Sequence, residues 1–369
     1  MLPWGVLRLD ERRKVVKHIR FLTALTIAVI VLLLLTAATP MGVFPTAGGY
    51  TQMTYDIKAG LVILYGGGYS GYRFYDPRSW SRETWTFNPE THVWVQKFPA
   101  VSPDAHSGGD MTYDSKAGVS ILSILPDNWL LLQPTAPLRT WAYDAQTNVW
   151  TKLADGPRPV VGQRIVYDAE SDRIIMFGGI DVTNFKAIDE TWVYDYNTDT
   201  WTDMQPRVYP VARNYQGMVY DPKADRVVLW GDGQRNYTPA TDSAVWTYDY
   251  NTNTWQAFDH KKDGPAVRDY IHLTYDAKGD KIIMYGGYDY GNNETWTYDL
   301  NSDTWQQMNP LTNPGVLSRY SMVYAKSVNR TILFGGQEGP TNYANPQYKT
   351  DTWSYNLKAD TWTNISPGQ

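Results

Sequence analysis

A pair of tryptophans nine residues apart occurs six times along this chain of 369 residues. The pairs are Trp85/Trp94, Trp141/Trp150, Trp192/Trp201, Trp246/Trp255, Trp296/Trp305 and Trp353/Trp362. An aromatic residue stands two positions after the first tryptophan of each pair, as in "TWVYDYNTDTW" at 191–201. Self-similarity with a period of about fifty residues is typical of repeat architectures, in which neighbouring units bury one another. The sequence therefore predicts six similar units.

A second marker, a tyrosine usually followed by aspartate, precedes each tryptophan pair. These tyrosines are Tyr55, Tyr113, Tyr167, Tyr220, Tyr275 and Tyr324. An apolar run that commonly ends in two glycines, such as "IIMFGG" at 174–179, lies between the two markers. Each unit is predicted to hold four strands, because glycine permits the backbone to turn after the second strand and Asn, Thr and Asp suit the hairpin before the second tryptophan. The second unit lacks the glycine pair, so we expect it to be less regular.

Four-stranded units with these markers resemble the Kelch repeat, over about residues 45–369. The resemblance implies an all-β fold, a six-bladed Kelch β-propeller of four-stranded antiparallel blades, similar to the central domain of galactose oxidase. The first unit starts at its first strand and the last unit ends at its fourth strand. Closure of the ring is therefore expected to rest on side-chain packing between the first and the last blade.

The N-terminal part of the chain is predicted to cross a membrane. Residues 21–38 read "FLTALTIAVIVLLLLTAA" and carry no charge, which is enough for one transmembrane helix. Basic residues precede this run, so residues 1–20 are expected in the cytoplasm and the propeller outside it. Residues 39–44 are the predicted linker. The run is either a retained signal anchor or a signal peptide cleaved near "TAATP", in which case the protein is secreted.

Composition narrows the function. The chain has no cysteine, which excludes disulfides, thiolate zinc sites and the cysteine-modified copper site of galactose oxidase. The net charge is −5 although residues 1–38 are basic, so the predicted propeller is acidic and nucleic acid is not an expected partner. The five histidines do not form a plausible metal site. We expect no cofactor, no metal and no catalytic residue.

The candidate binding face is the end of the propeller that carries the long, varied loops, because binding residues concentrate on loops held by a rigid frame. Aromatic, amide, guanidinium and imidazole groups there suit a sugar or an acidic peptide, although each residue also suits structural packing. The candidate ligand-binding residues are His106, Arg164, Arg213, Arg268, Asp269, His272, Arg319, Tyr72, Trp80, Tyr237, Tyr288 and Tyr343.

The leading hypothesis is a membrane-anchored, extracytoplasmic Kelch propeller that binds a protein or glycan and catalyses nothing. The alternatives are a non-hydrolytic sugar-modifying enzyme of the mutarotase or oxidase type, and a purely structural surface protein.

Overall fold

Short runs rich in β-branched and aromatic residues form antiparallel strands throughout the described part of the chain. The computed structural model describes residues 44–72, 76–104, 108–126, 136–231, 243–258, 264–288, 292–339 and 345–367. They lie in one compact unit, Phe44–Pro367. Within them the chain builds six four-stranded sheets, each with its strands in chain order.

The six sheets are named here from first to sixth along the chain. The first three consist of β1 (Gln52–Asp56), β2 (Leu61–Tyr65), β3 (Thr84–Asn88) and β4 (Val93–Lys97); of β5 (Asp110–Asp114), β6 (Val119–Ile124), β7 (Arg139–Asp144) and β8 (Val149–Lys152); and of β10 (Arg164–Asp168), β11 (Arg173–Phe177), β14 (Thr191–Asp195) and β15 (Thr200–Asp203). The other three consist of β16 (Gly217–Asp221), β17 (Arg226–Trp230), β18 (Val245–Asp249) and β19 (Thr254–Phe258); of β20 (Leu273–Asp276), β21 (Lys281–Tyr285), β22 (Thr295–Asp299) and β23 (Thr304–Met308); and of β25 (Ser321–Ala325), β26 (Arg330–Phe334), β28 (Thr352–Asn356) and β29 (Thr361–Asn364).

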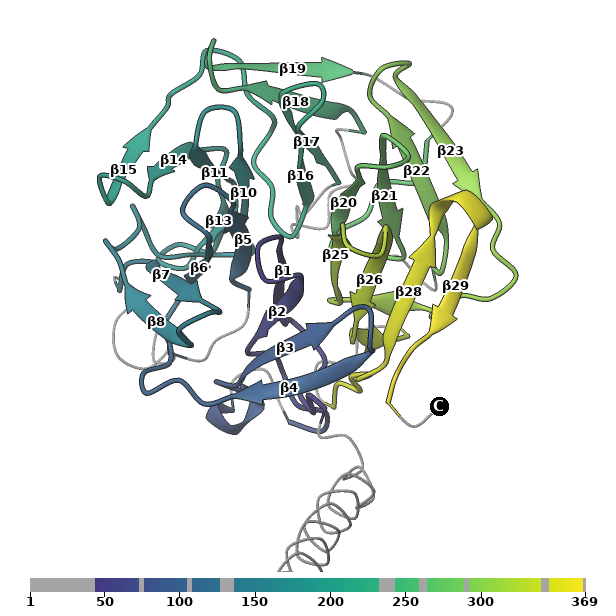
Figure 1. Cartoon of the computed structure of the whole chain (residues 1–369). Helices are drawn as coiled ribbons and strands as arrows, with labels where there is room; N and C mark the ends of the chain where they lie inside the picture. The colour runs from purple at the N-terminus through teal and green to yellow at the C-terminus, as the bar shows by residue number, and fades with distance from the viewer. Residues whose placement is uncertain are drawn as a thin grey trace, which may run out of the picture. The chain divides into compact units, whose positions relative to one another are not determined.

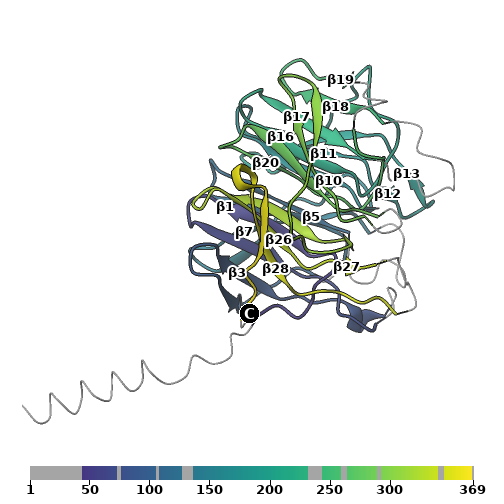
Figure 2. The same cartoon turned by 90° about the vertical axis from the view of Figure 1, so that its right-hand side faces the viewer.

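The sheets follow one another around a central axis, with the first strand of each innermost (Figure 1). Each innermost strand contacts that of the next sheet, and β25 contacts β1. Short strands belong to the long loops, namely β9 (Val160–Val161), β12 (Ile180–Asp181), β13 (Lys186–Ala187), β24 (Leu317–Ser318) and β27 (Gln337–Glu338). In the side view β12, β13 and β27 lie on the same side of the sheets (Figure 2), which we call the long-loop end. The hairpin turns between first and second strands form the opposite, short-turn end. Two 3₁₀ turns, η1 (Pro77–Ser79) and η2 (Leu357–Ala359), complete the secondary structure of the described residues.

The predicted all-β fold of four-stranded antiparallel sheets is confirmed. The second tryptophan of each pair packs on the neighbouring sheet, as in the contacts of Trp94 with Phe334 and of Trp150 with Tyr65, whose ring centroids are 5.0 and 5.2 Å apart. Trp94 and Trp150 are about 95% buried. Aromatic side chains between sheets therefore supply much of the apolar burial that one four-stranded sheet lacks.

The contact between the first and sixth sheets uses more than the predicted side-chain packing. The backbone N–H of Gly336 donates to the carbonyl of Gly48 at 2.7 Å, and that of Tyr50 donates to the carbonyl of Arg319 at 2.9 Å. The indole Nε1 of Trp94 donates to Thr352 Oγ1 at 3.0 Å. Backbone hydrogen bonds thus join the two ends of the repeat array without a strand exchanged between the described sheets.

The expected irregularity of the second unit is absent from its strands. β5 to β8 form a complete ladder with four-stranded order, like the other sheets of the described residues. Ile124 and Leu125 stand where the other units have the glycine pair, and both are buried. The loop that follows, at 127–135, lies outside the described residues.

Several sequence predictions concern residues that the structure does not describe. The predicted cytoplasmic segment 1–20, transmembrane segment 21–38 and most of the linker 39–44 are among them. In the described part of the chain, no helix has the length and apolar character needed to cross a bilayer.

Candidate functional site

Six residues in the left-handed backbone conformation surround the axis at the long-loop end, one from the segment before the first strand of each sheet. They stand five positions before the repeat tyrosines and are Tyr50, Gly108, Gly162, Tyr215, Tyr270 and Arg319, with φ between 52° and 74°. Backbone N–H groups connect neighbouring members: Tyr50 donates to Arg319, Tyr215 to Gly162, and Gly162 to Gly108, at 2.8–2.9 Å. We call this set the mouth ring. Left-handed tyrosine and arginine carry backbone strain, which persists only where the surrounding structure determines it.

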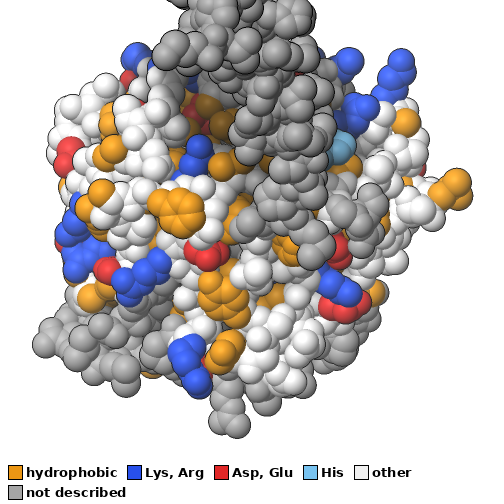
Figure 3. All heavy atoms as spheres, turned by 60° about the horizontal axis from the view of Figure 1, so that its bottom comes forward, with side chains coloured by type: hydrophobic (Ala, Val, Ile, Leu, Met, Phe, Trp, Pro, Cys, Tyr) orange, Lys and Arg blue, Asp and Glu red, His pale blue; other side chains and the backbone are white. Residues whose placement is uncertain are grey.

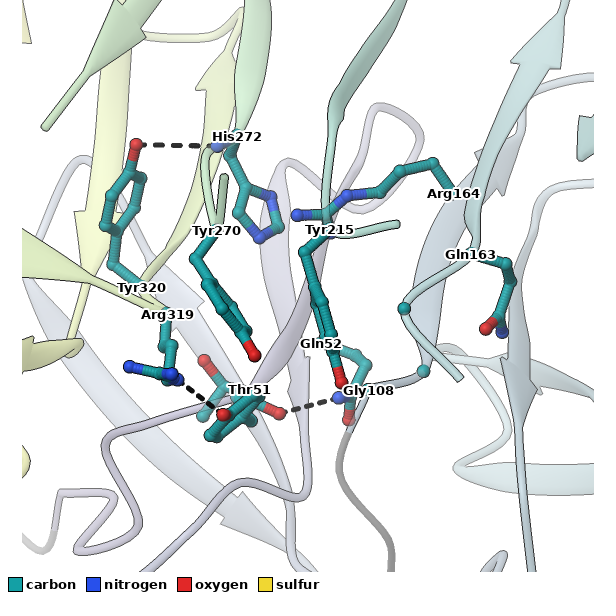
Figure 4. Close-up of a pocket in the computed structure, with 13 residues that line it drawn as sticks. Thr51, Gln52, Gly108, Gln163, Arg164, Tyr215, Tyr270, His272, Arg319 and Tyr320 are labelled. Atoms are coloured by element: carbon teal, nitrogen blue, oxygen red, sulfur yellow. Dashed lines mark hydrogen bonds between the residues drawn. The ribbon is translucent and has the colours of Figure 1, made fainter. Parts of the chain in front are cut away.

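The large side chains of the mouth ring fill the channel. The Tyr215 and Tyr270 rings stack at 4.2 Å, and the Arg319 guanidinium lies 3.9 Å from the centre of the Tyr270 ring. Glycine is required at two ring positions, because a Cβ on Gly162 would lie 2.9 Å from the Tyr215 ring and one on Gly108 2.2 Å from Val161. Figure 4 shows these side chains pointing toward one another. The remaining cavity of about 20 Å³ has room for little more than a water molecule.

The four predicted arginines are buried and hydrogen-bonded within the protein. Arg164, Arg213, Arg268 and Arg319 have at most 7% of their surface exposed. Arg213 donates to the carbonyl of Gly231 at 2.9 Å, and Arg164 donates to the carbonyls of Gln216 and Ile271, both at 2.7 Å.

Arg268 shows the same pattern and adds an ion pair. It donates to the carbonyl of Gly286 at 3.3 Å and to Glu294 at 2.9 Å. Burial alone would raise the pKa of Glu294, but hydrogen bonds from Trp296 and Arg268 hold it below its usual range. The arginines thus stand near the channel, and the donors named above bind acceptors within the protein.

Asp269 and His272 also lie near the axis, with different exposures. Asp269 is buried, and its carbonyl accepts a hydrogen bond from Tyr288 N at 2.8 Å. His272 lies on the short-turn side of the mouth ring, where its imidazole ring tilts against the Tyr320 ring with the centroids 5.8 Å apart (Figure 4). Burial, with a smaller contribution from the nearby Arg164, lowers the pKa of His272 well below its usual value. His272 is therefore a neutral imidazole at pH 7.

The predicted aromatic residues divide into three groups. Trp80 and Tyr288 are half-buried beside the mouth ring, where Trp80 meets Tyr50 edge-on at 5.8 Å. Tyr72 is exposed, with the Arg78 guanidinium 5.2 Å from its ring centre. The remaining candidates, His106, Tyr237 and Tyr343, lie outside the described residues.

Sequence reasoning missed two parts of the channel. Tyr348 packs edge-on against Tyr50 at 6.4 Å, from the loop before β28. Asp110 lies below the mouth ring, where it accepts a hydrogen bond from Ile165 N at 2.9 Å and lies 3.5 Å from Arg164. Burial raises the pKa of Asp110, and Arg164 opposes that rise. Asp110, like Arg164 and His272, stands three residues before a repeat tyrosine. This shared position was the sequence signal that could have placed Asp110 in the channel.

Below these groups the channel widens toward the short-turn end. Its cavity of about 420 Å³ is lined by the innermost strands, including all six repeat tyrosines. Elsewhere in the described chain, Asp168, Glu170 and Asp225 bring carboxylate oxygens within 4.8 Å of one another. Asn251 donates to Glu170 at 3.1 Å and to Asp225 at 3.5 Å, so an amide already occupies part of this acidic group.

The described surface shows no basic stripe on the face drawn in Figure 3, where acidic and basic side chains are interspersed.

Comparison with protein families gives one match. Residues 219–369 match the family model of the KLHDC2/KLHL20/DRC7 Kelch-repeats domain. This match supports the Kelch-repeat family. It covers the fourth, fifth and sixth sheets apart from the start of β16, and the first three sheets carry the same tryptophan and tyrosine markers. Kelch-repeat domains are in general protein-interaction modules, which supports that broad role here.

Proposed function

We propose that the six sheets are the blades of one closed Kelch β-propeller, and that this propeller binds a partner protein through its long-loop end. In this proposal residues 21–38 remain as a signal anchor and hold the propeller outside the cytoplasm. The family match to residues 219–369 supports a protein-interaction module. The agreement between repeat markers and sheets supports the blade count.

The closed mouth ring is the observation that favours a protein over a small molecule as the partner. Ligand pockets for small molecules usually measure about 300–1,000 Å³, whereas the space left in the mouth ring is about 20 Å³. Among the described residues, the mouth ring therefore leaves no room for such a ligand, which favours a partner that binds the surface of the long-loop end. Tyr72 and Phe185 are exposed on its loops, with 37% and 68% of their surface accessible, and exposed aromatic rings are favoured contacts in protein interfaces.

Site-specific photo-crosslinking tests this assignment. A photo-reactive amino acid at Tyr72 or Phe185 is expected to capture one protein in intact cells. The same amino acid at Thr254, an exposed residue of the outer strand β19, is the matched control and is expected to capture none. Equal capture from all three positions, or none from the loop positions, would refute the assignment of the long-loop end.

The anchor has its own test. Mass spectrometry of the mature protein is expected to find residues 1–20 still present, and alkaline extraction is expected to leave the protein in the membrane. A mature N-terminus near residue 39 would replace the anchored form with a secreted one and would leave the binding proposal intact.

Glycan binding is the second candidate. The half-buried Trp80 and the exposed Tyr72 provide aromatic faces on which a sugar could stack. Binding on a glycan array that is lost in Tyr72→Ala would favour this candidate over a protein partner. Turnover of a sugar without added copper would instead favour a mutarotase-type enzyme.

A further inference from the structure

A groove of about 570 Å³ lies between the fifth and sixth sheets, at the short-turn end of the molecule. Its charged lining comes from Lys278 and Lys281 of the fifth sheet and from Arg330 and Lys358 of the sixth. Met308 and Leu357 add apolar surface to it. None of its lining residues belongs to the mouth ring or to the long loops.

The other sheets carry residues at equivalent positions, so the partners of each basic side chain can be compared between sheets. At the start of the second strand, three sheets carry a basic residue that is paired with an aspartate at the end of the third strand. These pairs are Arg173–Asp195 at 2.9 Å, Arg226–Asp249 at 3.0 Å and Lys281–Asp299 at 2.5 Å. In the sixth sheet the basic residue is Arg330, but the position of the aspartate is occupied by Asn356.

A second ion pair is lost at the same groove. The hairpin-turn lysine of one sheet elsewhere pairs with an aspartate of the next sheet, as in Lys116–Asp172 and Lys223–Asp280. The hydrogen bond from Lys223 lowers the pKa of Asp280. Between the fifth and sixth sheets the lysine is Lys278, but the aspartate is replaced by Asn329, five residues after the repeat tyrosine.

A third change adds a charge. In three sheets an asparagine of the second hairpin donates to the aspartate that stands five residues after the repeat tyrosine of the same sheet. These contacts are Asn197–Asp172 at 3.0 Å, Asn251–Asp225 at 3.5 Å and Asn301–Asp280 at 3.1 Å. The sixth sheet has Lys358 in place of that asparagine, and its side chain is exposed.

The three changes act together on the charge of the groove. At the equivalent positions between the fourth and fifth sheets, two positive and two negative charges cancel. The five residues here, Lys278, Asn329, Arg330, Asn356 and Lys358, carry three positive charges and no negative one. Asp276 also lines the groove and carries one negative charge, but its counterpart Asp221 in the fourth sheet makes the same backbone contacts, so the difference between the two sites stands. The surplus therefore stands on a protein whose net charge is −5.

Two backbone carbonyls hold the Arg330 guanidinium in place. Its Nη1 donates to the carbonyls of Asn329 at 2.8 Å and Val328 at 3.3 Å. In the fourth sheet the corresponding Arg226 makes the same kind of backbone contact through Nη1 and uses Nη2 for Asp249. Asn356 instead accepts a hydrogen bond from Ala359 N at 3.4 Å. The Arg330 guanidinium therefore lacks the aspartate carboxylate that Arg173 and Arg226 bind in their sheets.

We propose that this groove binds an acidic segment of a partner protein, with a Glu or Asp carboxylate of the partner taking the place of the missing aspartate beside Arg330. A planar guanidinium binds a carboxylate with geometric specificity, and Lys278 and Lys358 provide additional charge at the rim. Leu357 and Met308 offer apolar surface to other side chains of the same segment. The proposal is independent of the long-loop end and holds whether or not the partner proposed for that end is found.

The test is fluorescence anisotropy with the full chain in detergent and a labelled peptide of six glutamates as the probe. Arg330→Gln is expected to weaken binding about tenfold, the loss of one charge-assisted contact. Asn356→Asp is expected to weaken it similarly, because it restores the internal partner of Arg330. Aspartate and asparagine both cap the turn that follows, so this variant preserves the local fold. Arg226→Gln removes the paired counterpart in the fourth sheet and is expected to leave binding unchanged.

Four outcomes would overturn the proposal. One is wild-type affinity in both Arg330→Gln and Asn356→Asp with unchanged thermal stability. Another is an equal loss in Arg226→Gln. Competition by inorganic phosphate as effective as that by the unlabelled peptide would show a simple anion site. Binding of the chain to vesicles of anionic lipid that Asn356→Asp abolishes, with no binding of the peptide, would show a lipid site.

Discussion

Replacing one buried valine by threonine is expected to stabilise this protein. In five of the six sheets, the second tryptophan donates from Nε1 to a threonine in the first two residues of the third strand of the preceding sheet. These contacts are Trp94–Thr352, Trp150–Thr84, Trp201–Thr140, Trp255–Thr191 and Trp362–Thr295, at 3.0–3.3 Å. In the remaining case the tryptophan is Trp305 and the equivalent residue is Val245, so the buried Nε1 of Trp305 has no hydrogen-bond partner.

The magnitude follows from burial. Val245 is fully buried and Trp305 is 8% exposed, and both belong to one apolar cluster. A buried donor without a partner costs about 1–3 kcal/mol, and a hydrogen bond contributes about 0.5–1.5 kcal/mol net. Val245→Thr adds an acceptor with nearly unchanged shape but buries a hydroxyl group. We therefore expect a gain of about 1 kcal/mol in the free energy of unfolding.

The reverse change tests the same reasoning at the contact between the first and sixth sheets. Thr352→Val leaves Trp94 without its acceptor and is expected to cost about 1–3 kcal/mol. Both variants are measured by guanidinium denaturation monitored through tryptophan fluorescence. In a Trp305→Phe background the gain from Val245→Thr must disappear, because the donor is then absent.

The reasoning fails if Val245→Thr is neutral or destabilising while Thr352→Val is also neutral. That pair of results would mean that the indole hydrogen bonds do not contribute to the contacts between sheets.

Three further predictions concern the mouth ring and its surroundings. Burial keeps His272 neutral in the folded protein. Its contribution to the free energy of unfolding is therefore complete above about pH 6.5 and falls by up to about 1.4 kcal/mol per pH unit below it. His272→Gln should remove this part of the pH dependence when denaturation is compared at about pH 7 and about pH 5. Gly162→Ala should cost about 1–3 kcal/mol more than Gly60→Ala, because both have positive φ but only Gly162 faces the Tyr215 ring; equal costs would contradict this. Arg213→Gln should lower the melting temperature without changing crosslinking at the long-loop end, and the reverse would make Arg213 a binding residue.

The repeat markers predicted the strands because each one reports a local requirement. Tryptophan pairs nine residues apart fit a hairpin, and glycine after the second strand fits a backbone with positive φ, as at Gly178 and Gly179. The same markers misjudged the second unit. Its strands pair normally because a ladder of hydrogen bonds depends on backbone register. Ser123 and Ile124 pair with Thr140 and Arg139 of β7 although this unit has no glycine pair.

The candidate site was harder to predict. Arg213 and Arg268 stand near the channel as expected, but their hydrogen-bond acceptors are backbone carbonyls of residues eighteen positions later. No local pattern shows whether a guanidinium turns outward to a ligand or inward to such a carbonyl. Burial decides it, since a buried cation must find acceptors within the protein.

By itself the sequence determined that this chain is a repeat of β hairpins, because strand periodicity, turn residues and aromatic spacing are properties of neighbouring residues. It also contained the two asparagines and one lysine that set the sixth unit apart. Only the tertiary structure brought Lys278 of the fifth sheet to the same groove as Arg330 and Lys358 of the sixth. The physical reason is that an ion pair depends on distance in space, so a missing partner can be recognised only where the two sheets meet.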